Sequence, residues 1–259
     1  MEKAPGLRHS YVLAALGRFC QGQGLGAGPI GHGLVEAFVA LGLPGRAPST
    51  RGTYRSVLRR DVAGKPPRAA AGFPPSPAAR PYKSQELAEL WSVAASQKSP
   101  WRRTSALSFL ALGIGAGLRP AELAAVTGAD IRAEHEAVAV RASNGRVVAV
   151  AGTYAKVLAQ QAEETGEGHL FCPGGADRHY KNFVNNFCRT LVASPTGPMF
   201  SSGRARSTFI CSHLATGTPL RELLYMTGIS EVESLLRYAR AVPGAPSSKA
   251  ELRARSRSG

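Results

Sequence analysis

The sequence predicts a mainly helical protein with one small β-hairpin, divided into two domains. Apolar residues recur at helical spacing along most of the 259 residues. Only one pair of Val-rich segments alternates as strands do. Residues 63–81 are rich in Pro, Ala and Gly, a composition typical of a linker. We therefore expect a helical domain over residues 1–62, a mixed domain over 82–240 and a disordered basic tail over 241–259.

The chain is strongly basic. It has 32 Lys and Arg against 17 Asp and Glu, which gives a formal net charge of +15. Such an excess indicates a polyanionic partner, either a nucleic acid or an anionic membrane surface. Residues 1–80 hold 11 of the basic and 3 of the acidic side chains, so the predicted first domain has the higher charge density. No apolar stretch approaches the length of a membrane span, and we expect no membrane association.

The predicted first domain is helical, and its third helix is basic. Helices are expected over residues 10–20, 33–43 and 49–61. Arg51, Arg55 and Arg59 follow each other at i, i+4 and i+8 in the third helix, so they share one face. A stripe of arginines beside an apolar face is typical of a helix that lies along nucleic-acid phosphates. These three residues are therefore candidate DNA contacts.

The predicted second domain combines helices with the hairpin. Its helices are expected over residues 84–96, 102–112, 154–163, 178–191, 206–215, 219–226 and 230–237. Pro120 favours the start of a further short helix directly after Arg119. Asn144-Gly145 lies between two alternating segments and predicts a tight hairpin turn, with Arg141 and Arg146 near its tip. A capping box of Ser230 and Glu233 predicts the start of the last helix.

The sequence lacks the common motifs of metal- and nucleotide-dependent enzymes. It contains no phosphate-binding loop, no dinucleotide fingerprint, no nucleophile elbow and no zinc-protease motif. The group of His169, Cys172 and His179 has the wrong spacing and too few thiolates for zinc. The four cysteines are widely spaced, which argues against a disulfide framework and favours a reducing cytoplasm. We expect neither a metal nor another cofactor.

Two arginine motifs carry a resemblance to a known family. The segment GLRPAEL, which contains Arg119, resembles the first arginine box of the tyrosine recombinases, the family of phage integrases and Xer proteins. Arg206-Ser-Thr-Phe209 resembles the second box. From there the pattern continues without a gap through Gly228, and Tyr238 falls on the position of the family's nucleophile.

The resemblance implies a two-domain protein that closes as a C-shaped clamp around duplex DNA. Arg119 and Arg206 would bind the scissile phosphate, and Tyr238 would form a 3′-phosphotyrosine intermediate during site-specific recombination. Arg141 falls where the family carries its general-acid Lys. The candidate DNA contacts are Arg51, Arg55, Arg59, Arg146 and Arg204. The family also implies a mobile element, a bacterial or phage cytoplasm with the nucleoid, and a monomer that assembles into a dimer or tetramer on DNA.

The sequence also departs from the family at its proton-transfer positions. Gly203 stands where the family has His or Lys, and Ile229 where it has His or Trp. Arg141 holds its proton more tightly than the usual Lys, and is therefore a poor proton donor. Two interpretations stay open: a recombinase that cleaves DNA, and a degenerate relative that binds DNA without cutting it. An RNA- or membrane-binding protein is a third, for which an aromatic RNA-binding strand and a Lys-rich anchor are missing.

Overall fold

The protein divides into two compact units, Met1–Ser76 and Pro77–Gly259. The computed structural model describes residues 7–26, 28–62, 77–134, 137–174, 178, 182–191 and 197–242. The first part of the predicted linker, residues 63–76, and most of the predicted tail, residues 243–259, lie outside the described residues. The predicted limits of the linker and the tail therefore stay predictions.

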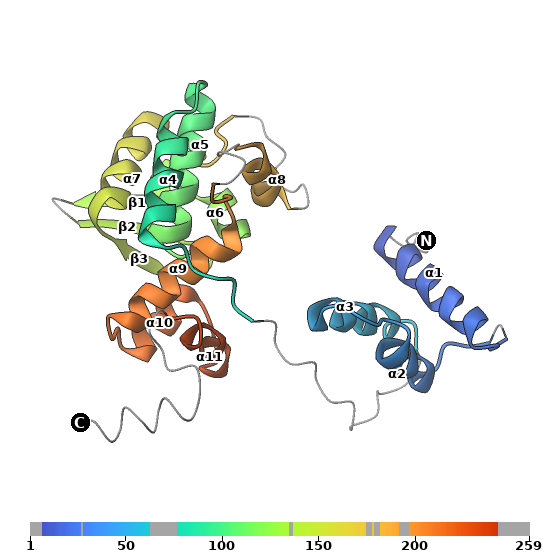
Figure 1. Ribbon diagram of the computed structural model, residues 1–259. Helices are drawn as coiled ribbons and strands as arrows, with labels where there is room; N and C mark the ends of the chain where they lie inside the picture. The colour runs from blue at the N-terminus through green and yellow to red at the C-terminus, as the bar shows by residue number, and fades with distance from the viewer. Residues whose placement is uncertain are drawn as a thin grey trace, which may run out of the picture. The chain divides into compact units, whose positions relative to one another are not determined.

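Over its described residues, the first unit has three helices around its own core (Figure 1). They are α1 (Leu7–Gly22), α2 (His32–Leu41) and α3 (Pro48–Leu58). Val35 and Leu58 are completely buried in this core, and the Phe38 ring packs at a tilt against the rings of Phe19 and Tyr54. α3 packs against both other helices, so the expected three-helix arrangement is present.

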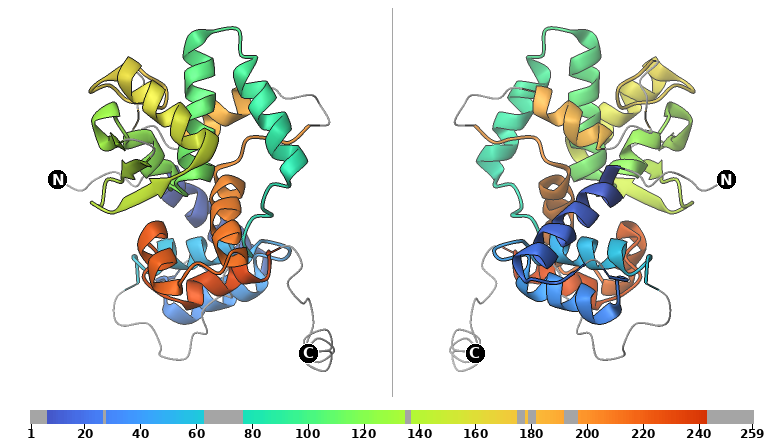
Figure 2. Two further views of the ribbon diagram at one scale, coloured as in Figure 1. Left: turned by 90° about the vertical axis from the view of Figure 1, so that its left-hand side faces the viewer. Right: turned by 90° about the vertical axis from the view of Figure 1, so that its right-hand side faces the viewer.

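The second unit contains the remaining helices and a three-stranded antiparallel sheet (Figure 1). Its helical elements are α4 (Ser84–Ala95), α5 (Pro100–Leu110), the π-helical turn η1 (Ala111–Gly115), α6 (Pro120–Ala125), the 3-10 turn η2 (Gly128–Asp130), α7 (Gly152–Thr165), α8 (Phe183–Thr190), α9 (Ser202–Ala215), α10 (Leu220–Thr227) and α11 (Glu233–Ala239). The strands are β1 (Ile131–Glu134), β2 (Ala137–Arg141) and β3 (Val147–Val150), in the order β1-β2-β3. α7 packs on the sheet, while α10 and α11 pack on α9 (Figure 2).

The hairpin forms where the sequence predicts it. The main chains of Ala142 and Arg146 close the turn with a 2.9 Å hydrogen bond, and Gly145 takes the positive φ of +83° that this turn requires. The sequence did not predict β1, which pairs with β2 from Ile131 opposite Val140. The four residues of β1 carry a single β-branched side chain, which is too weak a signal by itself.

Glycines allow the apolar segment after α5 to pass close to its neighbours. The predicted helix over 102–112 continues as a π-helical turn to Gly115. A Cβ at Gly113 would lie 3.1 Å from Ala205 in α9, and one at Gly115 would lie 2.7 Å from Tyr154 in α7. η1 is therefore held between α7 and α9, and it leads directly to Arg119.

The predicted capping box at the last helix is wrong. α11 begins at Glu233, its N-cap is Val232, and no side chain caps it. Ser230 instead falls in the non-helical connection that follows Gly228, where Ile229 packs against the core. Within the described part of the chain, no helix is long and apolar enough to cross a membrane, and no group of three His, Cys, Asp or Glu side chains is placed to hold a metal.

Candidate active site

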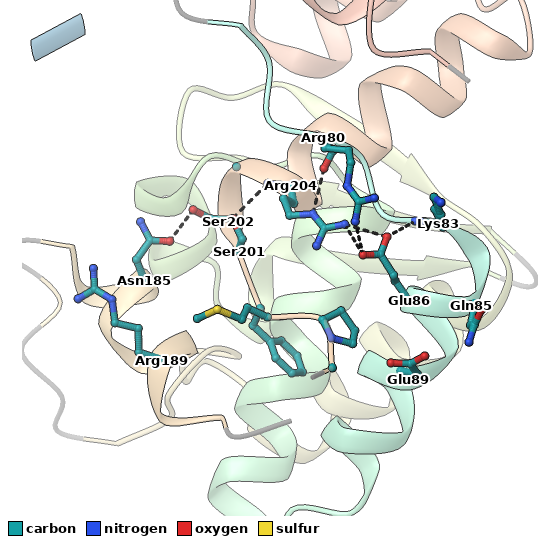
Figure 3. Close-up of a pocket in the computed structure, with 15 residues that line it drawn as sticks. Arg80, Lys83, Gln85, Glu86, Glu89, Asn185, Arg189, Ser201, Ser202 and Arg204 are labelled. Carbon is teal, nitrogen blue, oxygen red and sulfur yellow. Dashed lines mark hydrogen bonds and ion pairs between the residues drawn. The ribbon is translucent and has the colours of Figure 1, made fainter. Parts of the chain in front are cut away.

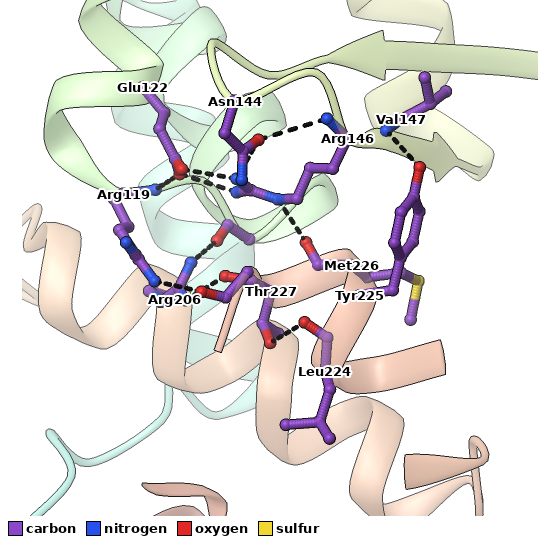
Figure 4. A network of polar contacts seen from close by, with 12 residues as sticks. Arg119, Glu122, Asn144, Arg146, Val147, Arg206, Leu224, Tyr225, Met226 and Thr227 are labelled. Atoms are coloured by element: carbon purple, nitrogen blue, oxygen red, sulfur yellow. Dashed lines mark hydrogen bonds and ion pairs between the residues drawn. The ribbon is translucent and has the colours of Figure 1, made fainter. Parts of the chain in front are cut away.

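Three arginine side chains meet at the C-terminal end of α10 (Figure 4). They donate to three successive main-chain carbonyls: Arg146 Nε to Met226 at 2.9 Å, Arg206 Nη2 to Thr227 at 2.6 Å and Arg119 Nη2 to Gly228 at 2.5 Å. We name these three side chains the arginine cluster. The fold thus brings Arg119 and Arg206 together, as one shared phosphate would require, whereas their roles stay predictions.

The end of α10 attracts these side chains for a physical reason. The last carbonyls of a helix lack partners within the helix, and its C-terminus carries partial negative charge. Gly228 ends α10 with φ +61°, and the amides of Gly228 and Ile229 fold back to Tyr225 and Leu224 in a Schellman motif. The main-chain carbonyls of Met226, Thr227 and Gly228 are left for other donors, and the arginine cluster donates to them.

Arg119 is placed by the turn that precedes α6. It is the N-cap residue of α6, with Pro120 in the first helical turn, and its main-chain amide donates to Glu122 Oε2 at 2.8 Å. Gly117 adopts φ +61°, and a Cβ there would lie 2.3 Å from the ring of Phe209. Gly117 is therefore required both by the turn and by the close packing of α9. The Arg119 side chain is exposed at this position.

Arg206 is mostly buried in α9. Besides Thr227, it donates through Nη1 to the carbonyl of Gly117. Burial lowers the pKa of Arg206, and the neighbouring Arg119 acts in the same direction, whereas Tyr238 and Glu122 oppose the shift. The guanidinium still stays protonated in a protein, because its reference pKa is so high. Arg206 is thus a fixed positive charge with an electrostatic neighbour in Tyr238.

Tyr238 lies in α11 and is only 5% exposed. Its hydroxyl accepts a hydrogen bond of 2.8 Å from Arg237 Nη2, and the Arg237 guanidinium lies 4.7 Å from the centre of its ring. Its main-chain carbonyl accepts from the Cys211 thiol of α9 at 3.5 Å. The predicted nucleophile is therefore packed against the helix that carries Arg206.

The arginine cluster is not neutralised. Glu122 is the carboxylate that it contacts, and it takes a bidentate ion pair from Arg146 at 2.5 and 2.7 Å. Burial opposes ionisation of Glu122, but hydrogen bonds from the Arg146 side chain and the Arg119 amide outweigh it and lower its pKa. Three guanidiniums therefore face one ionised carboxylate, and the excess positive charge favours an anion beside Arg119 and Arg206.

Arg146 differs from the prediction. The sequence suggested an exposed DNA contact near the hairpin tip, but the side chain is buried, with only 3% exposed. All of its described partners lie within the protein, namely Glu122, Asn144 and Met226. A DNA phosphate would have to displace these partners, which argues against a DNA contact by Arg146, and that role stays a prediction.

Arg141 and Arg204 also have partners within the protein. Arg141, on β2, is half exposed and forms an ion pair of 3.0 Å with Asp130, and it has no described contact with Arg119, Arg206 or Tyr238. Arg204, near the start of α9, is 18% exposed, donates to both oxygens of Glu86 at 2.8 Å, and lies 3.9 Å from the centre of the Tyr82 ring. The predicted roles of Arg141 and Arg204 stay predictions. In either role, the side chain would first have to leave these partners within the protein.

The basic stripe of α3 is likewise paired within the first unit. Arg55 and Arg59 both contact the carboxylate of Glu36 at 2.7 Å. Arg51 donates to main-chain carbonyls at the end of α2, those of Leu43 and Ala40. The three side chains keep the predicted helical spacing, but one acidic residue of α2 offsets part of their charge.

A polar pocket of about 1050 Å³ lies beside the start of α9 (Figure 3). Its charged lining residues are Arg80, Lys83, Glu86, Glu89, Arg189 and Arg204. Gly203 forms part of the wall, and a Cβ there would have Ala79 at 3.6 Å as its nearest neighbour. A Cβ at this position would therefore meet only ordinary van der Waals contacts.

Two features of the site escaped the sequence analysis. Glu122 was not among the candidate site residues, and the acceptor role of the α10 carbonyls had no sequence signal. Glu122 stands three residues after the N-cap, which indicates its bond to the Arg119 amide. Nothing in the local sequence indicates that Arg146, 24 residues later, is its ion-pair partner.

Several solved structures have the same fold as this chain. XerH site-specific recombinase bound to difH substrate is 14% identical with a TM-score of 0.59, covering 97% of this chain and 79% of that one. A lambda integrase dimer bound to a COC′ core site is 15% identical with a TM-score of 0.59, covering 96% and 92%. The Tn1549 transposon integrase with circular intermediate DNA is 15% identical with a TM-score of 0.59, covering 98% and 95%.

These likenesses confirm the predicted fold. The chain has the mainly helical tyrosine recombinase fold with a small antiparallel sheet. No family model and no curated protein sequence matches the chain. At these low identities the fold is shared, while the activity has to be argued from the site.

Proposed function

We propose that this protein cleaves and rejoins DNA strands through a covalent phosphotyrosine intermediate. The observation that carries the proposal is the uncompensated arginine cluster, in which Arg206 is an electrostatic neighbour of Tyr238. The solved structures with the same fold are recombinases and integrases, and those compared above are bound to DNA. The net charge of +15 supports the same partner.

The reaction follows from the residues of the site. The Tyr238 oxygen attacks the phosphorus of a DNA phosphodiester, and the new O–P bond forms as the bond from phosphorus to the 5′ oxygen breaks. Tyr238 loses its hydroxyl proton, and the leaving 5′ oxygen gains one. Arg119 and Arg206 stabilise the charge that develops on the non-bridging oxygens. One phosphodiester bond replaces another, so the reverse attack rejoins a strand without a cofactor.

The burial of Tyr238 adds a requirement to this mechanism. Its side chain is 5% exposed and that of Arg206 only 9%, whereas Arg119 is open to solvent. A DNA phosphate therefore meets Arg119 first. Tyr238 reaches the phosphorus only after α11, a helix of seven residues, moves relative to α9.

A second candidate function is DNA binding without cleavage. Arg141 stands where a proton donor is expected, and it is paired with Asp130. Gly203 has no side chain to take part in proton transfer. The loss of one acid–base group typically lowers a rate by about 10²–10⁴-fold. The same basic surface would then serve binding alone.

A nicked duplex that traps a covalent intermediate separates these functions. Wild-type protein is expected to form a covalent adduct slowly, and Tyr238→Phe to form none while its DNA affinity stays nearly unchanged. The matched control is Tyr225→Phe, which removes the hydroxyl of an exposed tyrosine on α10 together with the 3.1 Å hydrogen bond that it accepts from the Val147 amide, and which should leave the adduct intact. Tight binding by the wild type without any adduct would establish the second candidate.

The wider biological setting belongs to the same proposal. We propose that the protein is a monomer in solution that assembles into a dimer or tetramer on double-stranded DNA. We also propose that it serves a mobile element in a bacterial or phage cytoplasm, together with the nucleoid. Light scattering of the protein with and without duplex DNA tests the assembly.

A further inference from the structure

One carboxylate in the site holds two arginines in different ways. Glu122 Oε2 accepts the Arg119 amide at 2.8 Å, and the same carboxylate binds both terminal nitrogens of Arg146. The side chains of Glu122 and Arg146 are only 9% and 3% exposed. The backbone of Arg119 is therefore tied to a buried ion pair.

The guanidinium of Arg119 depends on the same ion pair. It donates to the carbonyl of Gly228, at the end of α10. Arg146 holds that helix end, because its Nε donates to Met226 and its Nη1 would lie only 3.2 Å from a Cβ at Gly228. Arg146 thus contacts both groups that hold Arg119. One is Glu122, which accepts from the Arg119 main-chain amide, and the other is the end of α10, which accepts from the Arg119 guanidinium.

We infer that Arg146 and Glu122 are positioning residues, which fix the Arg119 guanidinium in the orientation that receives a DNA phosphate. This inference rests on the proposed function, but only on phosphate binding and not on cleavage. We place the pair behind Arg119 and not on the phosphate, because every nitrogen of the Arg146 guanidinium already donates to Glu122, Asn144 or Met226. It also adds no net charge to the site.

Stability alone does not account for such a pair. Well-packed apolar residues often replace a buried ion pair at no loss of stability, because desolvation of the two charges offsets their attraction. A bidentate fork fixes direction as well as distance, which an apolar contact does not. The geometry therefore points to orientation of Arg119 as what the pair provides.

The test is the salt dependence of duplex DNA affinity, measured on the full chain. The double variant Glu122→Gln/Arg146→Met removes the pair without changing the net charge. Each phosphate contact contributes about −0.9 to the slope of log affinity against log salt. We expect the double variant to lose about one such contact, and Arg119→Ala to lose the same one. A triple variant that combines Glu122→Gln, Arg146→Met and Arg119→Ala should therefore lose no more slope than the double variant.

Two further variants keep the result interpretable. Arg146→Lys keeps the charge but loses the bidentate fork, and we expect it to lose the same amount of slope as the double variant. It therefore tests the inference even if the double variant does not fold. Leu158→Ala destabilises the second unit at a completely buried position in α7 and should leave the slope unchanged. A wild-type slope in both pair variants, or slope losses that add to those of Arg119→Ala, would overturn the inference. If the slopes are as expected but no covalent adduct forms, only the proposed cleavage is rejected, and this inference stands.

Discussion

At the scale of single residues, the ionised state of Glu122 supports the site. Burial opposes its ionisation, but hydrogen bonds from Arg146 and Arg119 lower its pKa below the ordinary value of 4.5. A carboxylate whose pKa is lowered by folding contributes stability above its unfolded pKa, and this stability is lost as the pH falls through the folded value. Acidification below about pH 4.5 should therefore weaken the second unit.

Glu122→Gln provides the corresponding prediction. At neutral pH the variant leaves Arg146 buried without its counter-charge, which should cost about 3–5 kcal/mol of unfolding free energy. As the pH falls through the lowered pKa of Glu122, the wild-type side chain is itself protonated, so the difference between the two proteins should shrink. Urea unfolding at neutral pH and over a series of acidic pH values measures this. A difference that stays constant with pH would show that the charge of Glu122 does not stabilise the fold.

The sequence nominated some residues of the candidate site and misplaced others for one physical reason. Arg119, Arg206 and Tyr238 could be nominated because their segments resemble family motifs in register, and their roles stay predictions. The partner of an arginine is set by tertiary packing, which has no local signal. Arg146 was therefore expected at the surface, and it instead forms a buried ion pair.

At the scale of elements, the end of α10 depends on a glycine. Gly228→Ala should destabilise the protein by about 1 kcal/mol or more, because alanine strongly disfavours φ +61°. Its Cβ would also lie 3.2 Å from Arg146 Nη1. Chemical unfolding with tryptophan fluorescence measures the effect. An unchanged unfolding free energy would contradict the account of this helix end.

Gly203→Ala is the opposite case. Gly203 lies in the first turn of α9, has no positive φ, and its Cβ would meet only ordinary contacts. Alanine restricts the unfolded chain and favours the helix, so a gain of about 0.5–1 kcal/mol is expected. The same unfolding measurement tests it, and a loss of stability would show that Gly203 is needed for its backbone.

Elements with a strong local pattern were predictable, and those fixed by neighbours were not. The Asn144-Gly145 turn formed where the pattern indicated, and the amphipathic helices formed near their predicted positions, although α9 begins earlier and α11 later than expected. The π-helical turn of Ala111–Gly115 depends on close packing against α7 and α9, and β1 depends on pairing with β2. Both are set by contacts between distant segments, so periodicity in the sequence did not reveal them.

At the scale of the whole molecule, the charge of the first unit is organised by one acidic residue. Glu36 of α2 pairs with Arg55 and Arg59, and the three side chains together carry one uncompensated positive charge. All three are partly exposed. With Arg51, whose described partners are main-chain carbonyls, the stripe expected from the sequence therefore keeps a net charge of +2 instead of +3.

Substitution at Glu36 should then change DNA binding in the direction opposite to substitution of its partners. Glu36→Gln releases a second positive charge, so the affinity of the full chain for duplex DNA should rise, and the salt slope should steepen by about 0.9. Arg55→Ala/Arg59→Ala leaves Glu36 alone and should flatten the slope by about the same amount. Fluorescence anisotropy at several salt concentrations measures both. Equal slopes in the wild type and Glu36→Gln would show that α3 does not face the DNA, and the contacts would then have to lie elsewhere on the basic surface.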